Sequence, residues 1–256
     1  MKRLIGLVFL IFLIGVLTPE GSASEKEWKM LDKKSSELFK DGRYEEAVKV
    51  NHEALKLVRA EFGDQHIEVA YFFNKLGLCY RFLDRFEEAE PLYLKALEIR
   101  RQLLAAEAPD VAESVNNLGT LYYLQERYEE SEPLYRESLK THEAVLGSEH
   151  LYVAQVSSNL ASVCVKLGKY KEAESLYNKS LAIVKKRDPR VIDFLLNKMI
   201  ELYKLTGEEE KIKELEIKLE ARAKVRKIKD RQIEDEKEEK KGMIEEIKNI
   251  LTSDNE

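Results

Sequence analysis

The sequence predicts an all-α protein, a solenoid of stacked helix–turn–helix repeats followed by a charged helix at the C-terminal end. Three observations lead to this prediction. A 42-residue pattern recurs along most of the 256 residues, and the apolar residues inside each copy have helical spacing. Charged residues make up 36% of the chain, which suits an elongated stack of helices because every helix keeps a wide solvated face.

The first 23 residues have the layout of a signal peptide. Two basic residues precede an apolar run, Leu4–Leu17, and small residues follow as far as Ser24. This run is shorter than the ~20 residues that span a bilayer. We therefore predict cleavage after Ala23 and export to the periplasm or the outside of a bacterial cell, with no integral membrane span left in the mature chain. Retention of the run as an anchor is the alternative.

The repeat is clearest in two adjacent copies, residues 71–112 and 113–154. Several side chains of the first copy recur in the second after 42 residues, and these are Leu76, Gly77, Tyr80, Arg85, Glu87, Glu88, Pro91, Leu92, Tyr93 and Leu97. Agreement of this kind over consecutive positions indicates structural repeats that stack on one another.

Further copies extend the pattern in both directions. They occupy residues 29–70 and 155–188, and a degenerate fifth copy begins at Pro189. The repeat domain is thus expected to cover residues 24–219. We expect the fourth copy to lose about one turn of its second helix, because few residues separate its last matching column from Pro189. Asp188 and Pro189 together predict the capped start of the next helix.

Within each copy the residue types predict how two helices pair. Glycines follow predicted helix ends, where a left-handed backbone is needed. Small residues at Gly77 and Gly119 would allow the paired helices to approach closely, and the tyrosines that recur at Tyr93, Tyr135 and Tyr177 would fill the space beside them. Such a pair cannot bury its apolar face alone and must stack on its neighbours.

These residues carry a family resemblance. The order LG…Y…YEEA…Y…AL resembles the tetratricopeptide repeat, and the 42-residue version with NNL, YEEAEPLY and LGxxH is similar to the repeats of kinesin light chain. The resemblance covers Lys29 to Leu219. It implies a right-handed superhelix whose first helices line a concave groove that binds peptides.

Residues 220–256 predict a charged helical tail that is partly disordered. Glu alternates with Lys and Arg over much of it, and an amphipathic patch returns from Met243 to Leu251. The pattern favours a solvated single helix held by Glu–Lys pairs. A coiled coil is the alternative, although residues 224–241 lack a sustained apolar seam.

The sequence contains no motif of a catalytic, metal-binding or cofactor-binding site. We therefore expect a protein that is not an enzyme and needs no cofactor. His66 and His150 occupy one column of the turn between copies and are expected to be turn residues or N-terminal capping residues. Cys79 and Cys164 lie two copies apart, too far for a disulfide. A net charge of −5 argues against nucleic acid as a partner.

The predicted first helices present a ladder of polar residues on the face that stacking does not use. Asparagine both donates and accepts hydrogen bonds, so it can hold the backbone of an extended peptide, while Lys and Arg favour an acidic segment or a terminal carboxylate. The candidate peptide-binding residues are Asn74, Lys75, Arg81, Asn116, Asn117, Thr120, Tyr123, Ser158, Asn159, Ser162 and Lys166. For Asn117 and Asn159 a role in stacking the repeats is an equal alternative.

The sequence therefore predicts a non-enzymatic adaptor in the cell envelope, which binds another protein or an extended peptide in the concave groove. The alternative is a self-assembling structural protein of the envelope that forms homo-oligomers through its charged C-terminal helix.

If the leader directs export, N-terminal sequencing of the protein recovered from the cell envelope should begin near Ser24 or Glu25, because small residues precede that bond. Recovery of the intact N-terminus in the membrane fraction would instead favour the anchor.

Overall fold

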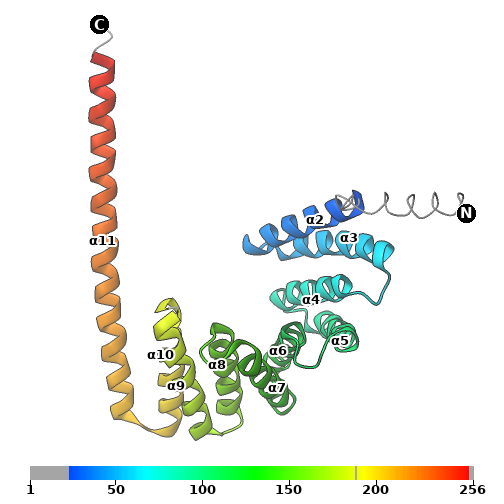
Figure 1. Ribbon diagram of the computed structural model, residues 1–256. Helices are drawn as coiled ribbons and strands as arrows, with labels where there is room; N and C mark the ends of the chain where they lie inside the picture. The colour runs from blue at the N-terminus through cyan, green and yellow to red at the C-terminus, as the bar shows by residue number, and fades with distance from the viewer. Residues whose placement is uncertain (1–22, 188, 254–256) are drawn as a thin grey trace, which may run out of the picture. The chain divides into compact units, whose positions relative to one another are not determined.

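The computed structural model describes residues 23–187 and 189–253, which are almost entirely helical and include no strand (Figure 1). The predicted leader lies outside the described residues except for Ala23. The chain divides after Ser148 into two compact units. Unit 1 contains α2 (Ala23–Lys40), α3 (Tyr44–Phe62), α4 (Ile67–Phe82), α5 (Phe86–Leu103), α6 (Pro109–Leu124) and α7 (Tyr128–Leu146). Unit 2 contains α8 (Leu151–Lys166), α9 (Tyr170–Arg187), the 3-10 turn η1 (Pro189–Val191), α10 (Ile192–Thr206) and α11 (Glu209–Ser253).

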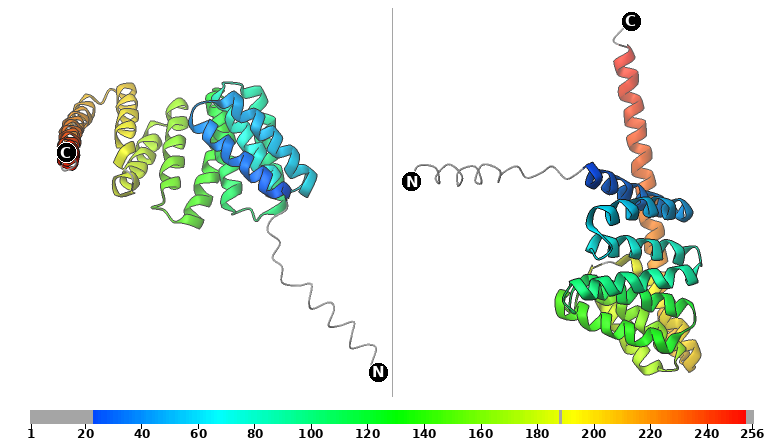
Figure 2. Two further views of the ribbon diagram at one scale, coloured as in Figure 1. Left: turned by 90° about the horizontal axis from the view of Figure 1, so that it is seen from above. Right: turned by 90° about the vertical axis from the view of Figure 1, so that its right-hand side faces the viewer.

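Each predicted copy forms a pair of helices. The pairs are α2 with α3, α4 with α5, α6 with α7, α8 with α9 and α10 with α11 (Figures 1 and 2). Within unit 1, α3 also packs on α4 and α5 on α6, and within unit 2 α9 packs on α10. The predicted all-α stack of helix–turn–helix repeats is therefore confirmed.

The turn inside each pair is set by one residue with a left-handed backbone. Gly42 and Gly168 have φ values of 74° and 72°, and between them Asp84 and Glu126 adopt 55° and 61°. These four residues are spaced by 42 positions along the chain. Glycine is the usual residue at such a position, so Asp84 and Glu126 show that the turn is imposed by the packing of the helices on both sides of it.

An arginine and a glutamate mark the start of each second helix in unit 1. The guanidinium of Arg127, just before α7, lies 2.7 Å from the Glu130 carboxylate, and Arg85 makes the same contact with Glu88 at 2.7 Å before α5. Two neighbouring glutamates thus occupy the first turn of each helix, Glu87 and Glu88 in α5 and Glu129 and Glu130 in α7. Their negative charges interact favourably with the positive end of the helix dipole.

The two histidines of the turn between copies cap first helices, as predicted. The imidazole of His66 accepts a hydrogen bond from the backbone N–H of Glu68 at 3.3 Å, and His150 accepts one from Tyr152 at 3.2 Å. Each imidazole therefore satisfies an N–H that the helix itself leaves unpaired.

A tyrosine ring lies against the backbone of the first helix in each central pair. Tyr93, Tyr135 and Tyr177 are 0%, 2% and 1% exposed. A Cβ atom added at Gly77 would lie 2.9 Å from the Tyr93 ring, whereas one added at Gly119 would come no closer than 3.3 Å to any atom. The predicted close approach is confirmed, and it is tighter at Gly77.

One buried cation between neighbouring copies was not predicted from the sequence. Arg100 on α5 is 3% exposed, and it donates hydrogen bonds to the Asp110 carbonyl and the Ser114 hydroxyl, both at 2.8 Å. Its charge is balanced by Glu113 at 3.1 Å. These contacts of one guanidinium nitrogen fix α6 against α5, because a buried charge without partners would be costly, while the Nε of Arg100 is buried without a hydrogen bond.

One expectation about the fourth copy and one about the start of the fifth are wrong. Its second helix, α9, has 18 residues, the same number as α5, so no turn is lost. The shortening falls in the connection that follows it. Pro189 opens the 3-10 turn η1 instead of an α-helix, and α10 begins at Ile192 with Val191 before it. Asp188 lies outside the described residues.

The last helix, α11, is 45 residues long and covers the end of unit 2. Ile212 and Leu215 are buried, and Arg222 and Arg226 both pair with Asp193 of α10. The predicted start of the tail at residue 220 falls inside this helix. None of the described helices is long and apolar enough to cross a membrane.

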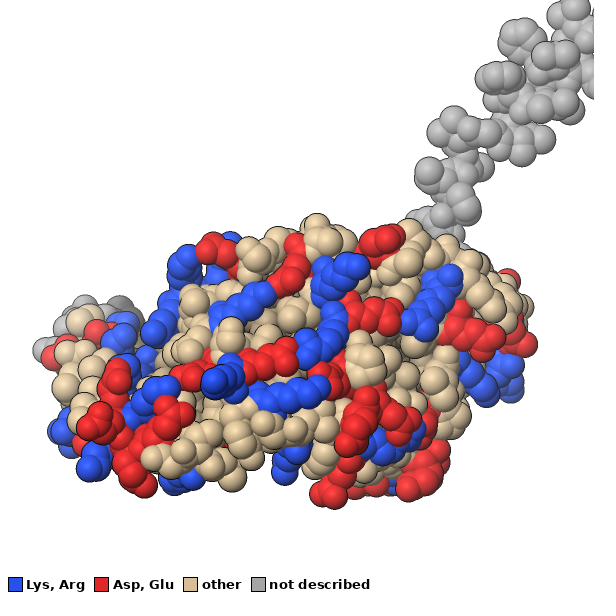
Figure 3. All heavy atoms as spheres, turned by 90° about the horizontal axis from the view of Figure 1, so that it is seen from below, with Lys and Arg blue, Asp and Glu red and all other residues tan. Residues whose placement is uncertain are grey.

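Charged side chains of both signs are interspersed over the face drawn in Figure 3. The exposed Arg101–Glu137 pair, 2.7 Å apart, is one of many surface ion pairs. Each such pair contributes little stability, about 0–1 kcal/mol, so the fold depends mainly on helix packing.

The packing of Tyr93 predicts unequal effects of adding one methyl group to different glycines. We expect Gly77→Ala to lower the free energy of unfolding by about 1–2 kcal/mol, because the overpacking cost exceeds the helix propensity that alanine gains. Gly119→Ala should cost less.

Chemical denaturation followed by circular dichroism measures both changes. Gly242→Ala is the matched control, since a Cβ there meets nothing within 4 Å. This control should leave stability unchanged or raise it. Equal losses for Gly77→Ala and Gly242→Ala would contradict the assigned contact.

Candidate functional site

The predicted site residues lie on three first helices, α4 and α6 of unit 1 and α8 of unit 2. Most of them are engaged in contacts between or within the repeats, and a smaller group surrounds Arg81. The contacts are described below for each unit by itself.

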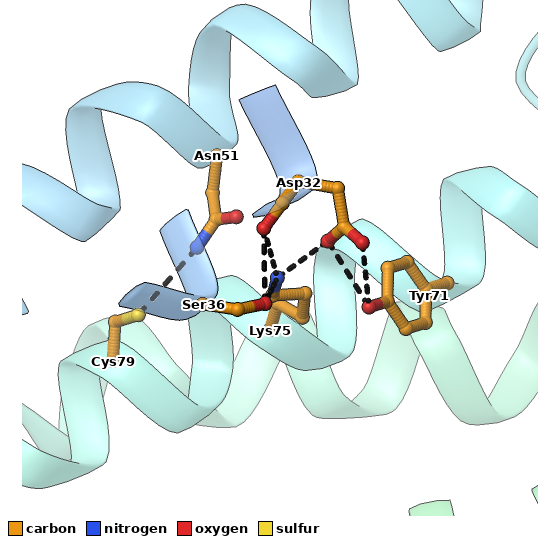
Figure 4. A network of polar contacts seen from close by, with 6 residues as sticks. All are labelled: Asp32, Ser36, Asn51, Tyr71, Lys75 and Cys79. Atoms are coloured by element: carbon orange, nitrogen blue, oxygen red, sulfur yellow. Dashed lines mark hydrogen bonds and ion pairs between the residues drawn. The ribbon is translucent and has the colours of Figure 1, made fainter. Parts of the chain in front are cut away.

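Lys75 joins the first two copies of unit 1 (Figure 4). Its ammonium donates to the Asp32 carboxylate at 2.5 Å and to the Ser36 hydroxyl at 3.0 Å. The Tyr71 hydroxyl also donates to Asp32, at 3.0 Å. Burial, and then the Asp32 charge, raises the pKa of Tyr71 well above its ordinary value. Lys75 is thus held between α2 and α4, with only 15% of its side chain exposed, and its charge is already balanced.

Cys79 lies beside this network and is a packed thiol (Figure 4). The Asn51 amide donates to its sulfur at 3.5 Å. Burial raises the pKa of Cys79 to about 11, so the thiol stays protonated near neutral pH and is a poor nucleophile. Cys79 in unit 1 and Cys164 in unit 2 are both buried, and neither is in a disulfide.

The asparagine ladder is a contact between repeats in unit 1. The Asn117 amide donates to the Asn74 side-chain oxygen at 3.0 Å, joining α6 to α4. Asn74 and Asn116 are 6% and 9% exposed, so the expectation that they line an open groove is wrong for most of their surface. The stacking role that was an alternative for Asn117 is the one its side chain performs. The side-chain oxygen of Asn116 is buried without a hydrogen-bond partner.

Hydroxyl pairs connect the two helices of the third and fourth copies. The Tyr135 hydroxyl donates to Thr120 at 2.8 Å, and Thr120 donates in turn to the Asn116 carbonyl at 2.9 Å. In unit 2 the hydroxyls of Ser162 and Tyr177 lie 2.9 Å apart, and Ser162 donates to the Ser158 carbonyl at 3.1 Å. The hydroxyls of Tyr135 and Tyr177 thereby each have a partner.

The second copy departs from this arrangement. Its residue in the column of Thr120 and Ser162 is Leu78, which has no hydroxyl. The hydroxyl of Tyr93 is therefore buried without a hydrogen bond. This departure was visible in the sequence as a leucine in a column of hydroxyl residues, but its importance depends on the burial of Tyr93.

Arg81 lies near that hydroxyl at the end of α4. Burial raises the pKa of Tyr93 to about 12, and the Arg81 guanidinium opposes the rise. Arg81 also stacks on the Phe82 ring, 4.6 Å from its centroid, and its Nε is buried without a hydrogen bond. Every other arginine described in unit 1 pairs with a carboxylate, and Arg81 has none among the described residues.

The Arg81 cluster consists of Arg81, Tyr93, Thr120, Tyr123 and Tyr135. The Arg81 charge and Tyr123 both influence the pKa of Tyr135, which burial raises, so these side chains lie within electrostatic range of one another. Tyr123 is half-buried and packs on Tyr128 with a centroid distance of 5.6 Å. Three of the predicted site residues, Arg81, Thr120 and Tyr123, are thus brought together by the fold.

In unit 2 the predicted residues border an open apolar cavity of about 270 Å³. Ser158 and Asn159 of α8 form one wall, and Val191 and Phe194 form another. Phe194 is 58% exposed, although it is large and apolar. Lys166 is exposed at the end of the same helix. The sequence did not indicate Phe194, because it lies in the most degenerate copy.

Comparisons with known proteins agree with this architecture. The family model described as "Tetratricopeptide repeat" matches residues 37–102 and 110–186. The crystal structure of BtubC (BKLC) from P. vanneervenii is similar, with a TM-score of 0.66 and 20% identity over 78% of this chain and 91% of that one. No curated protein matches the sequence.

Two further solved structures share the fold. A putative kinesin light chain from Podosopora anserina, with nearly identical TPR-like repeats, has a TM-score of 0.66 and 19% identity over 76% of this chain and 94% of its own. A Rap protein complexed with competence and sporulation factor has a TM-score of 0.63 and 17% identity over 75% of this chain and 53% of its own. At such identities the similarity shows the fold alone.

The unpaired hydroxyl of Tyr93 leads to a test with two matched substitutions. Tyr93→Phe should leave the free energy of unfolding unchanged or raise it, because no hydrogen bond is lost and a buried unsatisfied group is removed. Tyr135→Phe should lower it by about 0.5–1.5 kcal/mol, since the bond to Thr120 disappears. Urea denaturation measures both. A loss for Tyr93→Phe as large as that for Tyr135→Phe would show that the Tyr93 hydroxyl has a partner after all.

Proposed function

Because the chain belongs to the tetratricopeptide-repeat family, whose fold generally serves as a non-enzymatic scaffold for protein interactions, we propose that it is an exported adaptor that binds a carboxylate of another protein at Arg81. The proposal has two parts, the place of action and the mode of binding. A fold alone identifies neither, so each part is argued from its own residues.

The leader pattern supports action in the cell envelope. A short apolar run follows two basic residues and precedes small residues, as in chains that are exported and processed. The protein would then meet its partner in the periplasm or outside the cell.

The observation that carries the binding mode is that Arg81 has no carboxylate among the described residues and lies beside the Tyr93 hydroxyl, whose proton has no acceptor. A buried donor without an acceptor costs about 1–3 kcal/mol, so both groups gain when an acceptor arrives. A carboxylate is the acceptor that suits a guanidinium best, because it offers two oxygens and the opposite charge. In the next two copies the hydroxyl of Thr120 or Ser162 pairs with the tyrosine hydroxyl. The second copy lacks that hydroxyl, so its tyrosine and Arg81 can donate to a ligand instead.

One neighbouring residue of unit 1 can extend the contact. Tyr123 presents a half-buried aromatic ring on α6. A segment that carries an apolar or aromatic group beside its carboxylate is the ligand that Arg81 and Tyr123 favour.

Unit 2 by itself offers a different surface. Its cavity bordered by Asn159 and Phe194 suits an apolar side chain, and the Asn159 amide can pair with a peptide backbone.

Labelled peptides distinguish the two sources of a carboxylate. The first peptide has an internal glutamate and an amidated C-terminus, the second is neutral with a free C-terminus, and the third lacks both carboxylates. We expect the protein to bind one of the first two in fluorescence polarisation and not the third. Arg81→Gln should weaken that binding at least tenfold, which corresponds to about 1.4 kcal/mol.

Arg101→Gln is the control for charge, because Arg101 is exposed and already paired with Glu137. It should leave the affinity unchanged, and circular dichroism should show the same helical content for all variants. Equal binding of the peptide without carboxylates, or equal losses for the two arginine variants, would contradict the proposal.

A further inference from the structure

The outer part of α11 has no partner within unit 2. Its first turns pack on α10 through Ile212 and Leu215, and Arg222 and Arg226 reach Asp193. Beyond that point the helix runs on past α10 (Figures 1 and 2). Every described side chain from Ala223 to Ile244 is exposed. A solvated helix of this length is not stabilised by packing, so some other contact is expected to hold it.

One face of α11 carries apolar residues that α10 does not cover. Ile217, Val225 and Ile228 are 67%, 53% and 56% exposed. With Ala221 they follow helical spacing. Ile217 and Ile228 lie on the side of the helix away from Ile212 and Leu215, and Ala221 and Val225 lie at the edge of that side, where they border open cavities between α11 and the preceding elements. Lys224 and Lys229 flank the stripe. The face is therefore available for docking while the contact with α10 remains intact.

Charge divides the same helix into two halves. Residues 222–231 contain six Lys or Arg and one Asp, and residues 234–246 contain seven Asp or Glu and three Lys. Apolar residues return at Met243 and Ile244, which are 60% and 55% exposed. A basic segment with an apolar stripe is thus followed by an acidic segment with an apolar end.

These halves cannot pair within one chain, because both belong to a continuous helix and lie end to end. A second copy running parallel in register would place like charges together, which is unfavourable. An antiparallel copy would place each basic segment beside an acidic one. It would also bring Met243 and Ile244 of one copy close to Val225 of the other.

We propose that two copies of this chain associate through antiparallel α11 helices, with the basic segment 222–231 of each copy lying along the acidic segment 234–246 of the other. The contact is symmetric, so each residue pair occurs twice, as in a closed dimer. It extends over ~38 Å at 1.5 Å per residue. This association is independent of the carboxylate site at Arg81, and it doubles the number of such sites in the assembly.

Charge reversal tests the pairing in the purified chain. The acidic variant combines Lys224→Glu, Lys227→Glu and Arg231→Glu. The basic variant combines Glu234→Lys, Glu236→Lys and Glu238→Lys. We expect the unmodified chain to sediment as a dimer at micromolar concentrations and physiological salt, and each variant to lose at least tenfold in dimer affinity.

The mixture of the two variants is the decisive measurement. Because one variant has two acidic segments and the other two basic ones, an equimolar mixture should form a heterodimer that neither forms alone. The control carries the same change of charge elsewhere, through Lys34→Glu, Lys56→Glu and Lys140→Glu, and should remain a dimer. Circular dichroism before mixing checks that the helices persist.

Two results would overturn the proposal. The first is an unmodified chain that sediments as a monomer. The second is a dimer that both variants retain, since its contact would then lie outside α11. A monomer that binds vesicles of phosphatidylglycerol and phosphatidylethanolamine would assign the basic face to a membrane surface instead.

Discussion

The fold depends on the contact between a tyrosine ring and the backbone of the helix that precedes it. Tyr93 and Tyr135 lie over Gly77 and Gly119, and Tyr177 occupies the same column of the fourth copy, where Ala161 replaces glycine. All three rings are almost wholly buried. A larger residue beneath a ring would force the paired helices apart, and each pair would then present a different surface to its neighbour. The regular stacking of copies therefore follows from this single contact.

Because the sequence repeats, a residue that differs from the other copies in its column is easy to recognise. The columns that hold the copies together are filled by interchangeable groups, such as the hydroxyls of Thr120 and Ser162. Leu78 breaks that column, and it leaves Tyr93 and Arg81 without acceptors in the interior of unit 1. An unsatisfied buried group in a native structure calls for an explanation, and a ligand that supplies the missing acceptor is one. The position where Leu78 interrupts the hydroxyl column is therefore a better candidate for a binding site than the asparagines that recur in the copies.

The long C-terminal helix, α11, is not held by the tyrosine contact of the central pairs. Its first turns are fixed by Ile212, Leu215 and the ion pairs of Asp193, which close the exposed end of the stack. Its outer turns have apolar residues on one side and opposite charges at the two ends. A capping helix needs neither feature, since a solvated polar surface is enough to end a solenoid. The two parts of α11 thus have separate roles, one within the chain and one between chains.

The sequence by itself determined the repeat, the pairing of helices, the capping histidines and the close approach at Gly77 and Gly119, because each depends on local spacing that recurs every 42 residues. The predictions for α9 and for the start of α10 were wrong. The fourth copy is shorter in the connection after α9, and helical periodicity does not predict the length of a connection. Only the tertiary structure decided which polar side chains are free of contacts with other repeats and can therefore contact a partner. Helical phase placed Asn74 and Lys75 on a free face, but neighbouring helices buried the first against Asn117 and paired the second with Asp32. Arg81 kept its charge unpaired because no carboxylate of the described chain reaches it, and that result depends on distances between copies that no single copy contains.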